Sequence, residues 1–509
     1  MATLRAGAAA LLVDPPLGLP MCGVVRRDWN ARGRLDHLEV TAMALEHDGY
    51  RVVLCGVDTL AIQSPEIDEI RRSVATATGA ALPAILINFS HTHHAPPGGC
   101  TIYGSFGEQD PEPEPATLEY IDELHRLIVD VCRLACERLE PAWVRWGVGA
   151  ADRCFNRRRR DADGRVRALD WHEDGMLDRS VPVLQAVRSN DEPIVTLVAF
   201  GCHTVTTGLQ EAGYSPDYVG PLRDAVRRWT GGECVFFIGA AGNVMPIVAF
   251  EDAGHERRAM GEDIALQALH ALGPRPIWPS RLYYEGGFRS GTPVATIRWE
   301  AIDTAAPVLA ASERRVSFPL QPIPTLAGIV DFRKRSEREL DAAARGGAAE
   351  AELRLLRFHG LNWARRVEAE IRSGNPRTAV EGTIGAVRIG DGVIATGPGE
   401  TFTEIGLAVK ERSPAIVTLY AGYTNGCISY FPIASEYPRG GYEPDYGNKT
   451  YGLPAQVDPC SDRLLVETAV DLVRELFPGH DVPETDAWRA SGALPVPLTY
   501  PLHNRPSEP

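Results

Sequence analysis

Residues 38–90 carry the pattern that most constrains the fold, because strand and helix signals alternate there over a short stretch. Two apolar runs, LEVTAMALEHDG and RVVLCGVD, meet at Asp48 and Gly49, a dipeptide typical of a tight hairpin turn. A helix is predicted next, with Pro65 at its start and Gly79 at its end. The apolar strand AILINFS follows. This order predicts an α/β fold with a mixed β-sheet core and flanking helices.

The rest of the chain continues this pattern. Amphipathic helices are predicted over 117–139 and 462–477, and a helical excursion beside the sheet over about 335–373. Further strands are expected at AWVRWGVGAA, PVLQAVRS, PIVTLVAFGCH, CVFFIG and AIVTLYAGY, with a hairpin over 383–397. We find no internal repeat and no low-complexity linker, so residues 1–478 are expected to form one large domain. Residues 479–509 are rich in proline and polar residues, which predicts an extended C-terminal tail.

Composition argues against several classes of protein. The 509 residues carry a net charge of −15, whereas nucleic-acid binding needs a basic face. No run approaches the ~18 apolar residues that span a bilayer. The short apolar stretch at the N-terminus ends at Asp14 and two prolines without a cleavage site, so we expect a first strand, not a signal peptide, and a cytoplasmic protein. The ten cysteines form no CxxC pair, which agrees with that compartment.

Histidines follow two of the predicted strands. In the run HTHH, His91 and His93 are two residues apart, so in extended backbone they face the same side and can reach one site. One would bind a metal and the other would assist or transfer a proton; the alternative is a polar turn whose histidines bond to the backbone. His203 ends the apolar strand VTLVAFGCH, where a lone histidine is more often structural. Asp58 also lies past a strand end, where chemistry collects in α/β sheets.

Four further segments carry side chains that are ambiguous in isolation. Glu400, in GPGETFTE, is either a ligand or a helix cap favoured by the helix dipole. Tyr430 and Tyr442 lie in a Pro/Gly-rich stretch, where tyrosines are usually packing residues. The small-residue segment 239–246 is either a tight turn or a loop whose N–H groups hold an oxyanion. The run NRRRR, 156–160, is expected to be mostly a solvated face, with one arginine able to hold a substrate.

Taken together, these segments resemble the neutral/alkaline ceramidase family. HTHHAPPGG is similar to its His-Thr-His-Ser-x-Pro-Gly-Gly signature, and GCHTVT to the segment of its second zinc histidine. PGETFT resembles Pro-Gly-Glu-Phe-Thr-Thr, and YFPIASEYPRGGYE resembles Gly-Tyr-Val-Thr-Thr…Tyr-Glu-Gly. The likeness spans about residues 3–478, the catalytic domain. It implies one Zn²⁺ per chain, bound by His91, His203, Glu400 and Tyr430.

The resemblance also implies roles for neighbouring residues. His93 would polarise or protonate the substrate, Arg157 would contact it, and Tyr442 would lie near the scissile amide. Zinc bound by nitrogen and carboxylate ligands keeps a position open for water and lowers the pKa of that water to about 7, so that hydroxide attacks the carbonyl. The loop containing Gly242 and Asn243 would stabilise the resulting intermediate.

Two positions depart from the family pattern. Met245 stands where family members place a serine, and His94 replaces the serine of the signature. Because a thioether cannot act as a nucleophile or hydrogen-bond donor like a hydroxyl, we expect a metal-activated water and a substrate other than ceramide. The predicted activity is hydrolysis of a small or lipid-like amide. An esterase or lactonase, a zinc-dependent lyase or isomerase, and a non-catalytic metal-containing binding protein are the alternatives; a homo-oligomer is left open.

Overall fold

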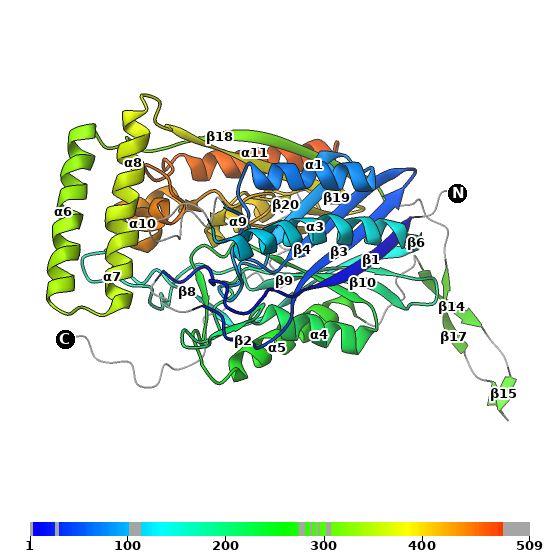
Figure 1. The fold of residues 1–509 in the computed structure, drawn as a ribbon. Coiled ribbons are helices and arrows are strands. Elements are labelled where there is room, and N and C mark those ends of the chain that lie inside the picture. Colours follow the sequence, from blue (N-terminus) through cyan, green and yellow to red (C-terminus); the bar gives the residue numbers. More distant parts are fainter. Residues whose placement is uncertain are drawn as a thin grey trace.

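The structure is a computed structural model, and it describes residues 4–25, 30–100, 113–273, 280–285, 288–290, 292–293, 296–301 and 307–481. Three sheets form the body of the molecule and helices pack against them (Figure 1). This arrangement confirms the predicted α/β class with mixed sheets. Among the described residues, no helix has the length and apolar character needed to cross a membrane.

The first sheet contains the hairpin and crossover that the sequence predicts. Its elements are β1 (Arg5–Val13), β3 (Leu38–His47), β4 (Tyr50–Val57), β5 (Ile85–Phe89), β6 (Glu140–Pro141), α1 (Glu66–Thr78) and α3 (Pro115–Glu137). The strand order is β5-β4-β3-β1-β6. β3 and β4 pair across Asp48 and Gly49, whose φ angles of 50° and 79° suit a two-residue turn. β4 and β5 are parallel, so α1, which ends at the left-handed Gly79, makes the crossover.

The second sheet has the order β12-β10-β9-β7. Its elements are β7 (Trp143–Ala150), β9 (Ser180–Val187), β10 (Pro193–Phe200), β12 (Glu233–Ile238), α4 (Val219–Thr230) and α5 (His255–Leu272). β10 and β12 are parallel, and α4 between them packs on β12 while α5 packs on β7 and β9. The segment containing His203 follows β10, so it begins at the carboxyl end of a buried strand.

The third sheet has the order β18-β19-β20-β22. Its elements are β18 (Leu309–Pro319), β19 (Ala379–Ile389), β20 (Gly392–Thr396), β22 (Val417–Ala421), α9 (Thr403–Glu411) and α11 (Ser461–Leu476). The β19–β20 pairing confirms the hairpin predicted over 383–397. β20 and β22 are parallel, and the connection between them contains Glu400 and α9.

The three sheets share an apolar interior. Fully buried side chains of β3, β10, β12 and β20 meet there, among them Met43, Leu197, Phe237 and Ile394. The alternate residues of β3, such as Ala42, belong to a second cluster that includes apolar residues of the helices. Because both faces of these strands are buried, they are apolar along most of their length, and their ends are held rigidly in place.

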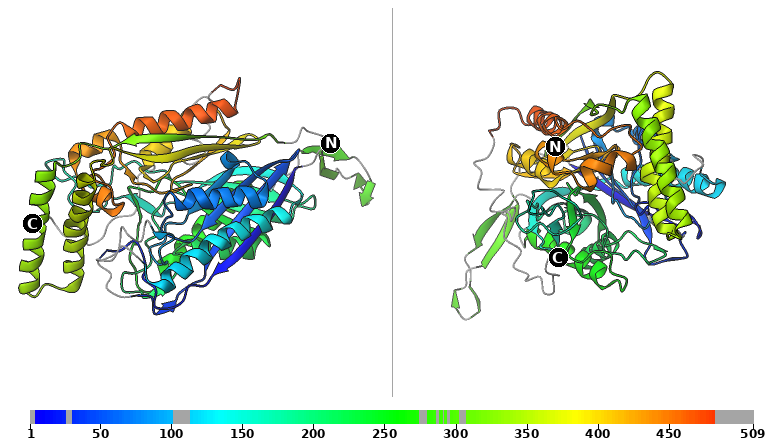
Figure 2. Two further views of the ribbon diagram at one scale, coloured as in Figure 1. Left: turned by 45° about the horizontal axis from the view of Figure 1, so that its top comes forward. Right: turned by 90° about the vertical axis from the view of Figure 1, so that its left-hand side faces the viewer.

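A helical excursion is inserted between β18 and β19. It consists of α6 (Leu326–Arg345), α7 (Glu350–Leu356), the π-helical turn η2 (Arg357–Asn362) and α8 (Trp363–Arg372). These helices stand at one end of the body (Figure 1, Figure 2). The excursion confirms the prediction for 335–373 but begins earlier, because the Thr325 hydroxyl accepts a hydrogen bond from the Gly328 N–H and caps α6.

Short elements complete the chain and carry much of the candidate site. They are β2 (Gly33–Arg34), η1 (Leu82–Ala84), β8 (Cys154–Asn156), β11 (Gly213–Tyr214), β13 (Val244–Pro246), β14 (Ser280–Glu285), β15 (Phe288–Ser290), β16 (Thr292–Pro293), β17 (Thr296–Ala301), β21 (Glu400–Thr401), β23 (Tyr430–Phe431), η3 (Ala434–Arg439) and α10 (Tyr442–Thr450). The predicted C-terminal tail lies outside the described residues from 482 onward.

Candidate metal centre

His91 and His203 come together although they follow strands of different sheets. Their ring centroids are 5.0 Å apart, and both side chains are almost fully buried. His91 has a φ of 59°, a left-handed conformation that non-glycine residues rarely adopt and that is enriched at functional sites. Backbone hydrogen bonding holds it there, because its N–H donates to the Thr59 carbonyl over 3.0 Å.

The hydrogen bonds of the two imidazoles fix their tautomers. Nδ1 of His91 lies 2.9 Å from the Leu60 carbonyl oxygen, and Nδ1 of His203 lies 2.6 Å from that of Ala241. Carbonyl oxygens only accept, so each Nδ1 carries a hydrogen, and in the neutral ring it is Nε2 that presents a lone pair. Burial, with a smaller contribution from Arg157, lowers the pKa of His203 to about 4, which keeps it neutral. Metal-binding histidines are commonly oriented in this way.

Glu400 directs a carboxylate oxygen at both free nitrogens. Its Oε2 lies 3.4 Å from His91 Nε2 and 3.1 Å from His203 Nε2. Ligands of a tetrahedral zinc ion, with metal–ligand bonds of about 2.0–2.2 Å, are separated by about 3.3 Å. Lone pairs of nitrogen and ionised oxygen that face each other at this spacing repel unless a cation lies between them. The donor set therefore fits a divalent ion of the size of zinc.

The backbone around Glu400 shows that it is not a helix cap. α9 begins at Thr403, whose N–H donates a hydrogen bond to Oδ1 of the Asn243 side chain over 2.8 Å. The alternative of a capping carboxylate is thus wrong, and the side chain points into the histidine pair.

Two tyrosine hydroxyls that the sequence analysis missed bind this carboxylate. The Tyr451 hydroxyl donates to Glu400 Oε1 over 2.6 Å, and the Tyr423 hydroxyl donates to Oε2 over 3.3 Å. The Tyr423 ring also lies 4.5 Å from the His91 ring, centroid to centroid. No local sequence pattern identifies either tyrosine as a site residue, because both contacts join residues that are distant in the sequence and meet only in the folded chain.

The predicted ligand Tyr430 lies beside Glu400. The two residues are direct partners in the parallel β21–β23 pair. The Tyr430 hydroxyl is 3.5 Å from Arg157 Nη2, and its ring centroid is 5.7 Å from that of Tyr442. Burial, reinforced by Glu400, raises the pKa of Tyr430 well above 10 when no cation is present. Tyr442 opens α10, and its hydroxyl lies 3.2 Å from Thr450 Oγ1.

His93 lies with the other two site histidines, as its spacing from His91 predicts. His91, His93 and His203 each offer a ring nitrogen within 4.8 Å of the others, which makes the three a candidate metal-binding group. His93 is half-buried, and Gly23 backs directly onto its ring. A Cβ at Gly23 would lie 2.5 Å from ring atoms of His93, so only glycine lets the N-terminal loop pass this closely.

His94 and Asp58 make structural contacts. His94 is buried, with its Nδ1 3.2 Å from the Gly213 carbonyl oxygen, and its backbone pairs with Ser215. Asp58 accepts two hydrogen bonds from Arg223, over 3.1 and 2.5 Å, and a third from the Glu39 N–H. Asp58 shows that a strand-end position does not by itself make a residue part of the site, while a role for His94 beside a substrate stays a prediction.

The arginine run is not the solvated face that the sequence predicts. Arg157 and Arg158 are buried, because Glu443 and Glu436 neutralise them. Glu443 accepts from Arg157 Nε over 2.8 Å and from Arg158 Nη1 over 2.5 Å, while Glu436 accepts from Arg158 Nε over 2.8 Å. Only the last two arginines of the run are partly exposed. These carboxylates lie about 280 residues further along the chain, beyond the reach of local patterns.

Arg157 connects several parts of the site. Besides Glu443, its guanidinium donates to the Gly242 carbonyl over 2.8 Å and lies near the Tyr430 hydroxyl. Much of its hydrogen-bonding capacity therefore serves the site itself. Contact between Arg157 and a substrate stays a prediction.

The predicted oxyanion loop contacts the segment that contains Glu400. The Gly242 N–H donates to the Thr401 carbonyl over 2.8 Å, and the Val244 N–H donates to the Ala241 carbonyl over 3.0 Å. The Asn243 side chain donates to Glu404 Oε2 over 2.9 Å besides capping α9. A Cβ at Gly242 would lie 2.4 Å from the Glu400 carbonyl oxygen. The Gly242 and Val244 N–H groups are thus already donated within the chain, and stabilisation of an oxyanion by this loop stays a prediction.

Met245 packs in a small apolar cluster beside this loop. It pairs with Phe155 in the β8–β13 ladder and contacts a cluster with Trp171 and Val205. Phe155 and Trp171 stack with centroids 5.0 Å apart. Met245 is thus a packing residue in this structure.

Comparison with solved structures identifies the fold. The neutral ceramidase from Pseudomonas aeruginosa matches with a TM-score of 0.64 and 18% sequence identity, over 96% of this chain and 77% of that chain. A ceramidase complexed with C2 matches with a TM-score of 0.64 and 17% identity, over 95% and 77%. No family model and no curated protein matches the sequence. At these identities the likeness concerns the fold alone, and the chain has a ceramidase-like fold.

Proposed function

We propose that the protein is a zinc-dependent hydrolase of amide bonds. The observation that carries this proposal is the position of Glu400 Oε2, which lies 3.4 Å from His91 Nε2 and 3.1 Å from His203 Nε2, the spacing of zinc ligands. Both histidines are held by carbonyl groups in the tautomer that binds metal. Tyr430, the strand partner of Glu400, is the proposed fourth ligand. The ceramidase-like fold supports the same class of reaction.

The chemistry divides between the ion and the surrounding side chains. When bound, zinc acts as a Lewis acid and supplies a water molecule with a pKa of about 7. His93, which is half-buried beside His91 and His203, is the residue proposed to move a proton at a ring nitrogen. Tyr442, whose ring lies next to that of Tyr430, is the residue proposed to contact the reacting amide.

The proposed substrate is a small or lipid-like amide other than ceramide. Met245 has no hydroxyl to act as nucleophile or donor, and it is buried against Phe155 and Trp171. A water nucleophile needs no serine, so the metal centre is sufficient for hydrolysis. Release of one amine and one acid from an amide library would support this reaction. Turnover of esters or lactones alone, or a product of unchanged mass, would favour the other enzyme classes.

The metal assignment is tested by counting zinc in purified variants. His91→Ala and His203→Ala should each lower the zinc content well below one ion per chain, because each removes one of three converging donors. His125→Ala is the matched control, since the ring of His125 bonds to the Gly98 carbonyl, outside the centre. Full zinc content in both site variants would disprove the assignment.

A further inference from the structure

We infer that Tyr451 is a positioning residue of the proposed metal centre and decides which oxygen of Glu400 faces the ion. The inference rests on the proposed function, because it concerns the same centre. The Tyr451 hydroxyl holds Oε1 of Glu400 over 2.6 Å, while Oε2 is the oxygen directed at His91 and His203.

The contact determines how the carboxylate can bind a cation. A carboxylate coordinates a metal through one oxygen or through both. Here Oε1 accepts a short, charge-assisted hydrogen bond from a buried phenol, and turning it to the ion would break that bond. Glu400 is therefore held as a ligand through Oε2 alone. A single-oxygen ligand leaves more of the coordination shell for water, as a hydrolytic zinc site requires.

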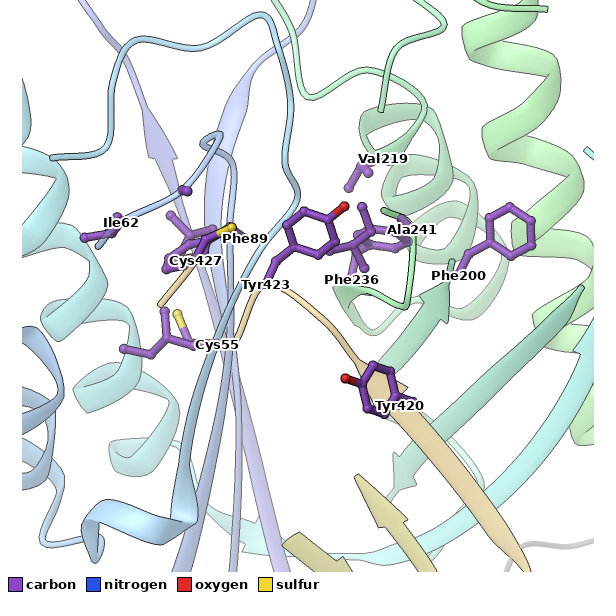
Figure 3. Packing of buried hydrophobic residues seen from close by; sticks show 14 of the residues in the cluster. Cys55, Ile62, Phe89, Phe200, Val219, Phe236, Ala241, Tyr420, Tyr423 and Cys427 are labelled. Atoms are coloured by element: carbon purple, nitrogen blue, oxygen red, sulfur yellow. The ribbon is translucent and has the colours of Figure 1, made fainter. Parts of the chain in front are cut away.

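The phenol is itself held rigidly. Tyr451 follows the last residue of α10 and is 5% exposed, and its N–H donates to the Gly447 carbonyl over 3.2 Å. Its hydroxyl oxygen lies 3.1 Å from Sγ of Cys427, a fully buried core residue (Figure 3). With the thiol on one side and the carboxylate on the other, the hydroxyl has one favourable orientation.

Tyr423 does not duplicate this function. Its hydroxyl contacts Oε2, the oxygen that faces the histidines, and the distance is longer at 3.3 Å. It therefore competes with a cation for Oε2, whereas Tyr451 fixes the opposite oxygen. The two hydroxyls act on different oxygens of one carboxylate, and only the Tyr451 contact selects single-oxygen binding.

The test compares two substitutions that each remove one phenol hydroxyl. Tyr451→Phe deletes the bond to Glu400, and Tyr437→Phe deletes a bond of 2.9 Å to the Val457 carbonyl, outside the centre. Competition with a chromophoric chelator measures zinc affinity. We expect the affinity of Tyr451→Phe to fall on the order of 10- to 100-fold, the usual effect of losing a partner of a metal ligand. The affinity of Tyr437→Phe should stay within about twofold of the original protein.

Spectroscopy separates positioning from general destabilisation. In the cobalt-loaded protein, a second carboxylate oxygen raises the coordination number, so Tyr451→Phe should weaken the visible absorption band and Tyr437→Phe should not. An infrared difference spectrum of the original protein, zinc-loaded minus zinc-free, needs no substitution. It should show the wide splitting of carboxylate stretches that marks single-oxygen binding.

The outcomes distinguish this inference from the proposed function. A chain that binds no zinc would disprove the metal centre itself. Zinc binding with a narrow carboxylate splitting, or with equal affinity in Tyr451→Phe, would overturn the role of Tyr451 and leave the centre intact. Equal losses of affinity in both tyrosine variants would show that Tyr451 acts only through stability.

Discussion

At the scale of single residues, the chemistry depends on which atoms are already hydrogen-bonded. His91 and His203 have Nδ1 occupied by carbonyl groups, so Nε2 is the atom left to bind an ion. Glu400 has Oε1 occupied by Tyr451, while Oε2, which accepts a longer hydrogen bond from Tyr423, faces the two histidines. In Gly242, by contrast, the N–H group already donates a hydrogen bond to the Thr401 carbonyl, so it is not available to bind a substrate. Residue type alone does not reveal these differences.

Replacing Met245 should separate packing from catalysis. Met245→Ala should leave the rate of amide hydrolysis within a few-fold of the original, because the thioether donates no hydrogen bond and packs against Phe155 and Trp171. It should lower the free energy of unfolding by about 2–5 kcal/mol through the cavity that it creates. Urea unfolding and initial rates measure both effects. An activity loss as complete as that of His91→Ala would mean that Met245 takes part in the reaction.

At the scale of elements, α10 joins the metal centre to the helical excursion. Tyr442 and Glu443 at its start contact the site, and Lys449 near its end lies among aromatic rings. The Lys449 ammonium is 4.9 Å from the ring centroids of Trp363 and Tyr446 and 5.2 Å from that of Phe332. The excursion is therefore docked on the element that supports Tyr430 and Arg157.

The stability of the folded protein should depend on pH through His359, a residue of η2. Burial, assisted by Lys449, lowers the pKa of His359 to about 4, and its Nε2 has no hydrogen-bond partner among the described residues. Between the unfolded pKa of about 6.5 and the folded value, the unfolded chain binds more protons, so stability falls as pH decreases. Acidification from pH 7 to pH 5 should therefore lower the free energy of unfolding by about 2 kcal/mol through this residue.

Urea unfolding of the original protein and of His359→Gln at both pH values measures this contribution. The variant should lose less stability on acidification than the original protein, by roughly the same 2 kcal/mol. Identical losses in the two proteins would show that His359 is not the responsible group.

At the scale of the whole molecule, the three side chains of the candidate centre follow strands of three different sheets. His91 follows β5 of the first sheet, His203 follows β10 of the second, and Glu400 follows β20 of the third. An ion bound by all three opposes separation of the sheets. Folding and metal binding are therefore expected to be linked.

Zinc should stabilise the whole protein against heat. Free zinc at 100 times its Kd should add about 2.7 kcal/mol to the free energy of unfolding, and a chelator should remove it. Calorimetry with and without chelator measures the shift in Tm. The increase in Tm caused by zinc should be unchanged in His125→Ala and absent in His91→Ala. A Tm of the original protein that does not change when zinc is added would contradict binding of one ion by residues of all three sheets.

The sequence by itself determined the features that depend on near neighbours. The turn at Asp48 and Gly49, the end of α1 at Gly79 and the adjacency of His91 and His93 follow from residues close in the chain, whose backbone preferences act locally. The resemblance of short motifs pointed to Glu400 without any structure, and in the structure its carboxylate lies beside His91 and His203.

Only the tertiary structure decided which groups meet and which atoms stay free. Tyr451 reaches Glu400 across 51 residues, and Glu443 neutralises Arg157 across 286. No local pattern predicts such pairs, so Tyr451 was missed and Arg158 was wrongly expected at the surface. The physical reason is that burial and hydrogen bonding of a side chain depend on what the folded chain places around it, and those partners come from segments that are distant in sequence.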